Sequence, residues 1–337
     1  MPTDELNKEG VMNAVRWGII GAGNVCEVKS APAMQRVPGS GIVAVMRRNA
    51  RMAQDYAERH GISRWYSRAE DLLADSEVNA VYIATPPSSH AELTGLAARA
   101  GYPIYVEKPM ARTYEECLSM IETCRACNVP LYVAYYRRYL PQYRFIKELV
   151  EADEIGALRT YSIELFRQAD RQTGMNTQNW RVQPQIAGDG YFYDLASHQL
   201  DFLDFLLGEV THASGIAVNQ AGHYQTSDLV SGVMQHSSGV AGSGTWCFTA
   251  GQAAVRDITT LTGSKGFIRF PTYDGSYVDV AKNGGQIKRY DFERPSHIQQ
   301  PLIEAIVQDL RAGTNACVST GVSASRTNRV MEWITTS

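Results

Sequence analysis

The chain of 337 residues is long enough for two domains, because single domains usually contain about 100–200 residues. Its composition, with 44% hydrophobic and 20% charged residues, is that of a globular protein. A net charge of -3 provides no basic field for nucleic acid or an anionic membrane, and every apolar stretch is shorter than a membrane span. We therefore expect neither a nucleic-acid partner nor a membrane partner.

Residues 1–13 are polar and lack the apolar core of a signal peptide, so we expect a flexible tail and a cytoplasmic protein. The six cysteines are scattered and do not have the spacing of a disulfide framework. Cys124 and Cys127 form a C-x-x-C pair, but it has no second pair and lies in a predicted helix at residues 113–127. We expect no bound metal.

The apolar run at residues 15–20 predicts the first strand, and a glycine-rich loop, Gly21-Ala22-Gly23-Asn24-Val25-Cys26, follows it directly. In the G-x-G-x-x-G/A fingerprint the first glycine permits a tight turn, and the second lets the backbone approach a pyrophosphate at the start of a helix. Cys26 departs from the usual third residue but is small enough for close packing. We predict dinucleotide contacts at Gly21, Gly23, Asn24 and Val25.

The second predicted strand, residues 41–46, ends at Arg47-Arg48-Asn49. Chains that bind NAD usually have an Asp or Glu here, which accepts a hydrogen bond from the ribose 2′-OH. Two guanidinium groups suit a 2′-phosphate instead, so Arg47 and Arg48 predict a preference for NADP(H) over NAD(H). The alternative is a solvated basic turn before the helix predicted at residues 50–60.

A third strand at residues 78–84 leads to Thr85-Pro86-Pro87-Ser88-Ser89-His90 and a helix at residues 91–100. Ser88 or Ser89 is a candidate N-cap, and His90 is interpreted as part of the cap region rather than as a chemical group.

The apolar run at residues 101–106 predicts a buried parallel strand, which Glu107-Lys108-Pro109 follows. Ligands of open α/β sheets bind at the carboxyl ends of the strands, so Lys108 could hold a substrate oxygen or a cofactor ribose. The alternative is a lysine that only extends its ammonium group to solvent. A strand at residues 129–134 then completes a doubly wound parallel sheet, the Rossmann domain of residues 14–134.

From residue 135 the pattern changes. A helix at residues 141–151 is followed by eight predicted strands and two closing helices. The sequence therefore predicts a second domain, residues 135–337, of α+β class with a large, mostly antiparallel open sheet. The strands are predicted at 158–167, 213–219, 228–236, 240–248, 257–262, 266–270, 276–280 and 286–290, and the helices at 298–311 and 322–335, the last free to pack back on the first domain.

Two strands of this sheet suggest a face that needs a partner. Tyr161, Ile163 and Leu165 alternate along one of them, and Val240, Gly242, Gly244 and Trp246 mark the other. An open sheet has to cover its second face, so we expect this face to bind a partner.

A helix predicted at residues 191–207 places Asp194 and His198 four residues apart, on one face. The carboxylate can orient the imidazole and raise its pKa, which suits a proton donor near neutral pH. The alternative is a surface Asp–His pair. Upstream, Trp180 could form a stacking wall or simply pack in the core, and Arg181 could bind substrate hydroxyls.

Taken in order, these motifs resemble the Gfo/Idh/MocA oxidoreductases over nearly the whole chain. The matching pieces are Gly21-Ala22-Gly23, residues 85–90, Glu107-Lys108-Pro109, Arg138 with Pro141, Trp180-Arg181, and Gly188-Asp189-Gly190 with Asp194 and His198. The resemblance implies that Lys108 lies beside the nicotinamide and the substrate and that His198 is the acid/base on the substrate oxygen. It also implies that the second domain binds the substrate and pairs copies of the chain into a homodimer or a homotetramer. Members of the family often have the Lys-Pro bond in cis, and the sequence leaves the Lys108–Pro109 bond open between cis and trans. Asp189 departs from the family's usual triple glycine, which implies a different loop shape.

The resemblance also implies further contacts. Thr85, Pro86, His90 and Glu107 would join Lys108 around the cofactor, and Tyr136 would join Trp180, Arg181, Asp194 and His198 around the substrate.

The implied activity is an NADP-dependent transfer of hydride to or from a sugar, a polyol or a related carbonyl compound. Some relatives instead hydrolyse glycosides with tightly held NAD, and others bind the dinucleotide as regulators without catalysis. Arg47 and Arg48 argue against the first alternative, and the presence of Lys108 and His198 argues against the second.

Overall fold

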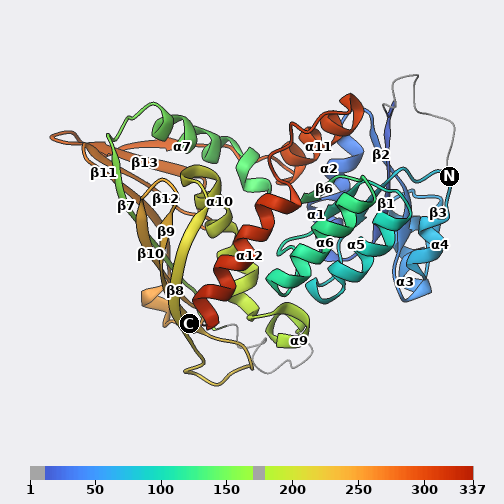
Figure 1. Ribbon diagram of the computed structural model, residues 1–337, viewed down its shortest axis with the longest axis horizontal. Coiled ribbons are helices and arrows are strands. Elements are labelled where there is room, and N and C mark those ends of the chain that lie inside the picture. The colour runs from blue at the N-terminus through green and yellow to red at the C-terminus, as the bar shows by residue number, and fades with distance from the viewer. Residues whose placement is uncertain (1–11, 170–178, 337) are drawn as a thin grey trace. The chain divides into compact units, whose positions relative to one another are not determined.

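The computed structural model describes residues 12–169 and 179–336, so the predicted tail at residues 1–13 lies almost entirely outside the described residues (Figure 1). The chain divides into two compact units. The first contains residues up to Ala111, Glu115–Tyr136 and Pro295–Ser325, and the second contains the rest. The sequence had assigned Pro295–Ser325 to the second domain. Within the described residues, no helix is long and apolar enough to cross a membrane.

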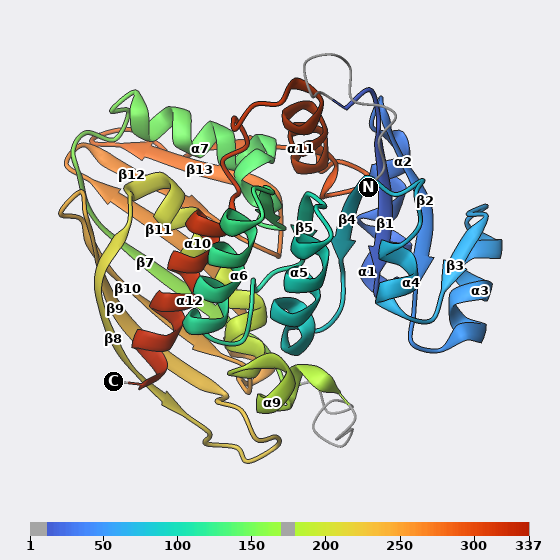
Figure 2. The same cartoon turned by 45° about the vertical axis from the view of Figure 1, so that its right-hand side comes forward.

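The first unit is built on a sheet of six parallel strands, which confirms the predicted doubly wound sheet (Figure 2). The strand order is β3-β2-β1-β4-β5-β6. Strand β3 was missed because its three residues are mostly exposed and lack an apolar run. The strands are β1 (Val15–Ile20), β2 (Ser40–Met46), β3 (Arg64–Tyr66), β4 (Ala80–Ile83), β5 (Ile104–Val106) and β6 (Leu131–Val133).

The helices of this sheet follow the strands along the chain, and α4 and α5 contact β1 and β4. The strand order reverses between β1 and β4, and in doubly wound sheets this switch point is where ligands bind. Gly21 and Thr85 follow the carboxyl ends of these two strands. The helices are α1 (Asn24–Val28), α2 (Ala31–Arg36), α3 (Ala50–Arg59), α4 (Ala69–Leu73), α5 (His90–Arg99), α6 (Tyr114–Ala126) and α11 (Gln300–Ala312).

The second unit contains an eight-stranded sheet in the order β14-β13-β12-β11-β7-β10-β9-β8. Only the β7–β10 pair is parallel, so the predicted large, mostly antiparallel sheet is confirmed. The strands are β7 (Leu158–Phe166), β8 (Val210–Val218), β9 (Leu229–His236), β10 (Ala241–Cys247), β11 (Arg256–Gly263), β12 (Gly266–Phe270), β13 (Tyr277–Lys282) and β14 (Lys288–Asp291). Its other elements include α7 (Pro141–Glu151), α9 (Pro184–Ala187) and α10 (Ser197–Leu207), and the boundary between the units falls inside α12 (Gly321–Thr336).

The prediction of a single α-helix at residues 191–207 is wrong in one respect. A π-helical turn at Phe192–Ala196, called the π segment below, precedes the α-helix α10. A π turn contains more residues than an α turn, so the simple four-residue spacing of Asp194 and His198 does not describe their geometry. Such turns are frequent at functional sites.

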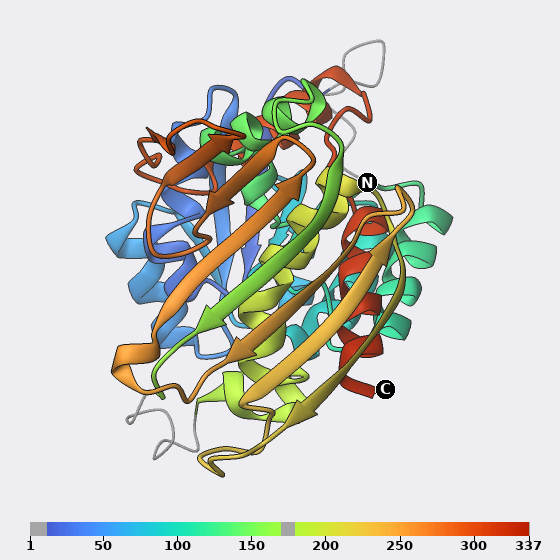
Figure 3. The ribbon, with the colours of Figure 1, turned by 90° about the vertical axis from the view of Figure 1, so that its left-hand side faces the viewer.

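The large sheet is open to the viewer in Figure 3, with α10 behind it. Tyr161, Ile163, Leu165 and Trp246 are at most 2% exposed and belong to the core of this chain. The prediction that these residues mark the face that needs a partner is therefore wrong. The pleat places the alternate residues of the strands on the other face, where Ile216 and Val233 are 67% and 57% exposed.

A row of glycines on the covered side allows α12 and an indole ring to approach the sheet. Gly232 of β9 pairs with Gly215 of β8 and with Gly244 of β10. A Cβ atom on Gly215 would lie 2.7 Å from Cγ2 of Ile334, and one on Gly244 would lie 2.2 Å from the Trp246 ring. The side chains of Ile334 and Trp246 occupy the space that Cβ atoms on these glycines would need.

We predict that Gly215→Ala lowers the free energy of unfolding by about 1–3 kcal/mol, because the added methyl group overpacks this contact. Gly41→Ala is the matched control, since Gly41 also lies in a strand but its Cβ would meet nothing within 4 Å. Urea unfolding of the two variants measures the difference. Equal midpoints for Gly215→Ala and the wild type would contradict the prediction.

Candidate active site

The glycine-rich loop has the backbone that the fingerprint requires. Gly21 has φ +89°, and a Cβ there would lie 2.5 Å from Cγ2 of Thr85. At Gly23 a Cβ would meet only the Gly21 carbonyl oxygen, at 3.6 Å, so the backbone is open on that side. Asn24 is exposed and Val25 partly exposed. These residues therefore fit a pyrophosphate that approaches the loop.

The third position of the fingerprint packs as expected. Cys26 is fully buried, and its carbonyl oxygen accepts a hydrogen bond of 3.2 Å from the Tyr56 hydroxyl of α3. Burial raises the pKa of the Cys26 thiol to about 12, so the thiol stays protonated. The small side chain of Cys26 is therefore accommodated inside the first unit.

Arg47 and Arg48 follow the carboxyl end of β2, where Arg47 is partly exposed and Arg48 is exposed. Within residues 12–169 and 179–336 neither guanidinium takes part in an ion pair, although many other arginines do. The Asn49 side chain caps α3 by accepting the Met52 N–H at 3.2 Å. Both arginines are therefore available to an anionic group at this strand end.

His90 lies between the turn at Thr85-Pro86 and the turn at Pro109, and residues in or next to both turns are predicted to contact the cofactor. Its Nε2 lies 2.8 Å from the Thr85 carbonyl oxygen, and its Nδ1 lies 3.1 Å from that of Met110. The ring is fully buried, and burial lowers the pKa of His90 despite these two contacts. Ser89 occupies the N-cap position, but its hydroxyl bonds to the Thr85 side chain rather than capping the helix. His90 therefore shapes the turns at Thr85-Pro86 and at Pro109 instead of presenting a surface to a ligand.

Glu107 has a similar supporting geometry. Its carboxylate accepts hydrogen bonds of 2.7 Å from both the Tyr82 hydroxyl and the Gln299 amide, and one of 3.2 Å from the Lys108 N–H. Only 8% of Glu107 is exposed. The carboxylate therefore fixes the backbone at Lys108, whose side chain is partly exposed at the carboxyl end of β5.

The Lys108–Pro109 peptide bond, which the sequence left open between cis and trans, is cis. Tyr136, the predicted substrate contact in the first unit, is 5% exposed.

In the second unit, Asp194 lies in the π segment and His198 in the first turn of α10, where only 3% of His198 is exposed. Asp194 forms an ion pair with Arg181, whose Nε lies 3.3 Å from the carboxylate. Arg181 also stacks on Trp180, with its guanidinium carbon 4.4 Å from the ring centroid. Arg181 thus contacts two residues that the sequence had assigned to the substrate.

Sequence reasoning missed Tyr273, a residue of the turn between β12 and β13. Its ring centroid lies 6.4 Å from that of His198, at 66°. The guanidinium groups of Arg137 and Arg167 lie 4.7 and 5.5 Å from the same Tyr273 ring. The local pattern around Tyr273 is an ordinary turn, so only the tertiary structure shows that it belongs with His198.

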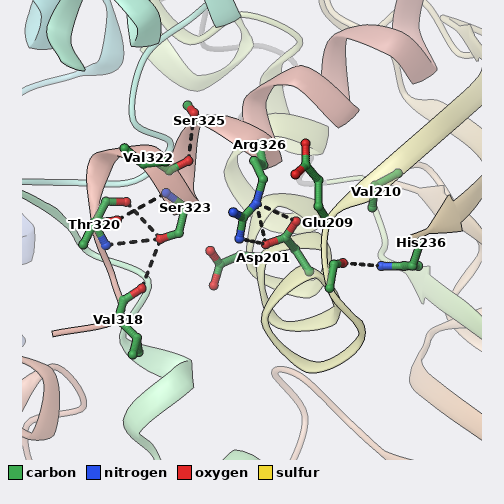
Figure 4. A network of polar contacts seen from close by, with 12 residues as sticks. Asp201, Glu209, Val210, His236, Val318, Thr320, Val322, Ser323, Ser325 and Arg326 are labelled. Carbon is green, nitrogen blue, oxygen red and sulfur yellow. Dashed lines mark hydrogen bonds and ion pairs between the residues drawn. The ribbon is translucent and has the colours of Figure 1, made fainter. Parts of the chain in front are cut away.

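Two ion pairs anchor α10. Arg138 pairs with Asp201 through bonds of 2.6 and 2.9 Å, and both side chains are at most 2% exposed. One turn later, Asp204 pairs with Arg326, which points from α12 toward α10 in Figure 4. Burial raises the pKa of the Asp201 carboxyl to about 6, and the charge and hydrogen bonds of Arg138 oppose this rise.

Comparison with known proteins agrees with this geometry. Residues 15–135 match the oxidoreductase family with an NAD-binding Rossmann fold, and residues 143–269 match the GFO/IDH/MocA C-terminal domain. The chain is 42% identical to oxidoreductase P35 of Formosa agariphila, over 87% of this chain and 90% of that protein. The chain belongs to the Gfo/Idh/MocA family and is an NAD(P)-dependent oxidoreductase.

Two further proteins show the range of the similarity. The chain is 29% identical to 1,5-anhydro-D-fructose reductase of Ensifer adhaerens, over 67% of each chain. The structure of levoglucosan dehydrogenase in complex with NADH and levoglucosan has a TM-score of 0.84 and 22% identity, over 95% of this chain and 96% of the other. The second similarity concerns the fold alone.

Proposed function

We propose that the protein is an NADP-preferring oxidoreductase that acts on a sugar or a closely related polyol or carbonyl compound. The observation that carries this proposal is the set of groups at the strand ends of the first unit: a loop open at Gly23, two arginines without ion-pair partners in the described chain, and Lys108 after β5. The sugar class is supported by the names of the two relatives above, which act on or bind sugar derivatives.

The bound dinucleotide would supply the hydride to a carbonyl carbon or accept it from an alcohol carbon. In the reductive direction, the Lys108 ammonium group would stabilise the charge that develops on the substrate oxygen. His198 would give its proton to that oxygen, and in the oxidative direction it would take the proton back. Trp180 and Arg181 of the second unit and Tyr136 of the first unit would contact the substrate, and the ion pair with Arg181 would fix the position of the Asp194 carboxylate.

We predict that Lys108→Ala lowers turnover by roughly 10²–10³-fold, because it removes the cation that stabilises the developing alkoxide. His198→Ala should lower turnover by about 10²–10⁴-fold through loss of the proton donor, while NADPH binding persists. Steady-state assays with NADPH and a panel of sugar carbonyl compounds measure both effects.

Lys29→Ala and His212→Ala are matched controls, because both residues are exposed and lie outside the proposed site. The controls should retain wild-type turnover. If His198→Ala were as active as His212→Ala, another group would have to supply the proton.

The cofactor preference rests on Arg47 and Arg48. A guanidinium can bind a 2′-phosphate through two parallel hydrogen bonds, and charge-assisted bonds of this kind are worth roughly 1.5–3 kcal/mol. At 1.4 kcal/mol per decade, a single contact corresponds to about a tenfold or larger preference.

We predict that NADPH binds at least about tenfold more tightly than NADH, and that added salt narrows the gap by screening. Replacing Arg47 and Arg48 with Ala should weaken NADPH and leave NADH nearly unchanged. Arg125→Ala, an exposed arginine of α6, is the control. Fluorescence titration at low salt measures the dissociation constants, and equal values for NADPH and NADH in the wild type would refute the preference.

We also propose that the open face of the large sheet pairs two copies of the chain, as a homodimer or within a homotetramer. Ile216 and Val233 are exposed apolar residues on adjacent strands, and the register places them diagonally on the same face. Exposed apolar side chains on an otherwise uncovered sheet face are typical of a surface that binds a partner.

We predict that Val233→Asp shifts the protein toward monomer, because it places a charge in the apolar part of this face. Ile287→Asp is the control, since Ile287 is equally exposed, at 57%, but precedes the edge strand β14. Light scattering at micromolar concentration measures the mass. A monomeric wild type would disprove the proposal.

A further inference from the structure

The π segment interrupts the helix immediately before His198. Its residue Leu195 lies between Asp194 and His198, and the Leu195 carbonyl oxygen accepts a hydrogen bond of 2.5 Å from the Tyr273 hydroxyl. A carbonyl inside a regular α-helix normally bonds to the N–H four residues later. The Leu195 carbonyl oxygen accepts the Ser197 N–H, and the hydroxyl of Tyr273 from a distant turn is an additional donor to it, three residues before the imidazole.

The Tyr273 backbone is held firmly by its own surroundings. One carboxylate oxygen of Asp257, a buried residue of β11, accepts the N–H groups of the three consecutive residues Thr272, Tyr273 and Asp274, at 2.5–2.9 Å. Arg294 donates to the Tyr273 carbonyl oxygen at 2.9 Å. The turn therefore has a fixed position on the sheet that does not depend on the π segment.

The Tyr273 ring is held as well. Arg137 donates to the Thr272 carbonyl oxygen at 3.0 Å while its guanidinium lies over the ring, and Arg167 pairs with Asp274 and lies near the ring at 5.5 Å. Cation–π contacts of this kind restrict how the ring can turn. A ring fixed on the sheet can thus serve as a reference point for the π segment.

We propose that Tyr273 is a positioning residue: its hydroxyl fixes the π segment and, through that segment, the imidazole of His198. The proposal rests on the role of His198 given above. Tyr273 itself transfers no proton in this scheme. The sheet of the second unit thereby determines the orientation of the proton donor on α10.

The test is Tyr273→Phe, which removes one oxygen atom and keeps the ring. Tyr143→Phe is the matched control, because the Tyr143 hydroxyl lies 3.5 Å from the Thr272 carbonyl oxygen in the same turn, and its ring packs on Phe202 of α10 at 4.7 Å. Both variants lose a hydroxyl near this turn, but only Tyr273→Phe loses the bond to the π segment.

We expect Tyr273→Phe to lower kcat about tenfold, which converts to about 1.4 kcal/mol, with KM and NADPH binding close to those of Tyr143→Phe. A general loss of structure would instead change all of these quantities together. If kcat of Tyr273→Phe equals that of Tyr143→Phe, the proposal is overturned.

A second readout does not depend on knowing the substrate. The protein has seven histidines, and in the full chain labelled with ¹³C-histidine the His198 ring signal is the one that His198→Gln removes. We expect the NMR chemical shift of this signal to change in Tyr273→Phe and to stay the same in Tyr143→Phe. An unmoved signal in Tyr273→Phe would overturn the link between Tyr273 and His198.

The two readouts separate this inference from the proposed function. Full activity in His198→Ala would show that His198 is not the proton donor. Positioning of His198 by Tyr273 would then have no effect on catalysis, and this inference would fail together with the proposed function. Loss of activity in His198→Ala, together with an unmoved His198 signal in Tyr273→Phe, would overturn only the role of Tyr273.

Discussion

The buried ion pair between Arg138 and Asp201 joins α10 to the segment by which the chain enters the second unit. Transfer of two charges out of water is costly, and the cost is offset only while both bonds of the bidentate pair are kept. Arg138 lies at the entrance of the chain into the second unit, and Asp201 lies on α10 three residues after His198. Removal of either partner would leave an uncompensated buried charge next to the proposed proton donor.

The first unit uses the same arrangement around Lys108. Glu107 is buried by Tyr82 and Gln299, which satisfy its carboxylate, and it holds the next peptide N–H of the chain. In each unit a buried carboxylate that transfers no proton supports a proposed catalytic residue. Glu107 precedes Lys108 in the sequence, and Asp201 lies on the same helix as His198. Buried, hydrogen-bonded charges are rigid, and rigidity is what a catalytic ammonium or imidazole group needs from its support.

Local patterns predicted most of the strands and helices, because a core-facing strand or helix must repeat its apolar residues at its own period. They failed where that signal is weak or absent: β3 is too short, and a π turn leaves no mark in an apolar pattern written for α-helices. Alternation along β7 revealed two faces of the sheet, but it did not show which face this chain would cover. Tyr161, Ile163 and Leu165 lie on the face of the sheet that this chain itself buries.

The sequence by itself determined the two sheets, the glycine-rich loop after β1, the positions of Lys108 and His198 along the chain, and hence the family, since these features depend on short stretches of residues. The tertiary structure alone decided which polar groups meet. The contacts of His90 with Met110, of Arg181 with Asp194 and of Tyr273 with Leu195 join residues 13 to 78 positions apart. Such pairs are set by how the strands and turns pack against one another, and side-chain periodicity carries no information about packing between elements that are distant in the chain.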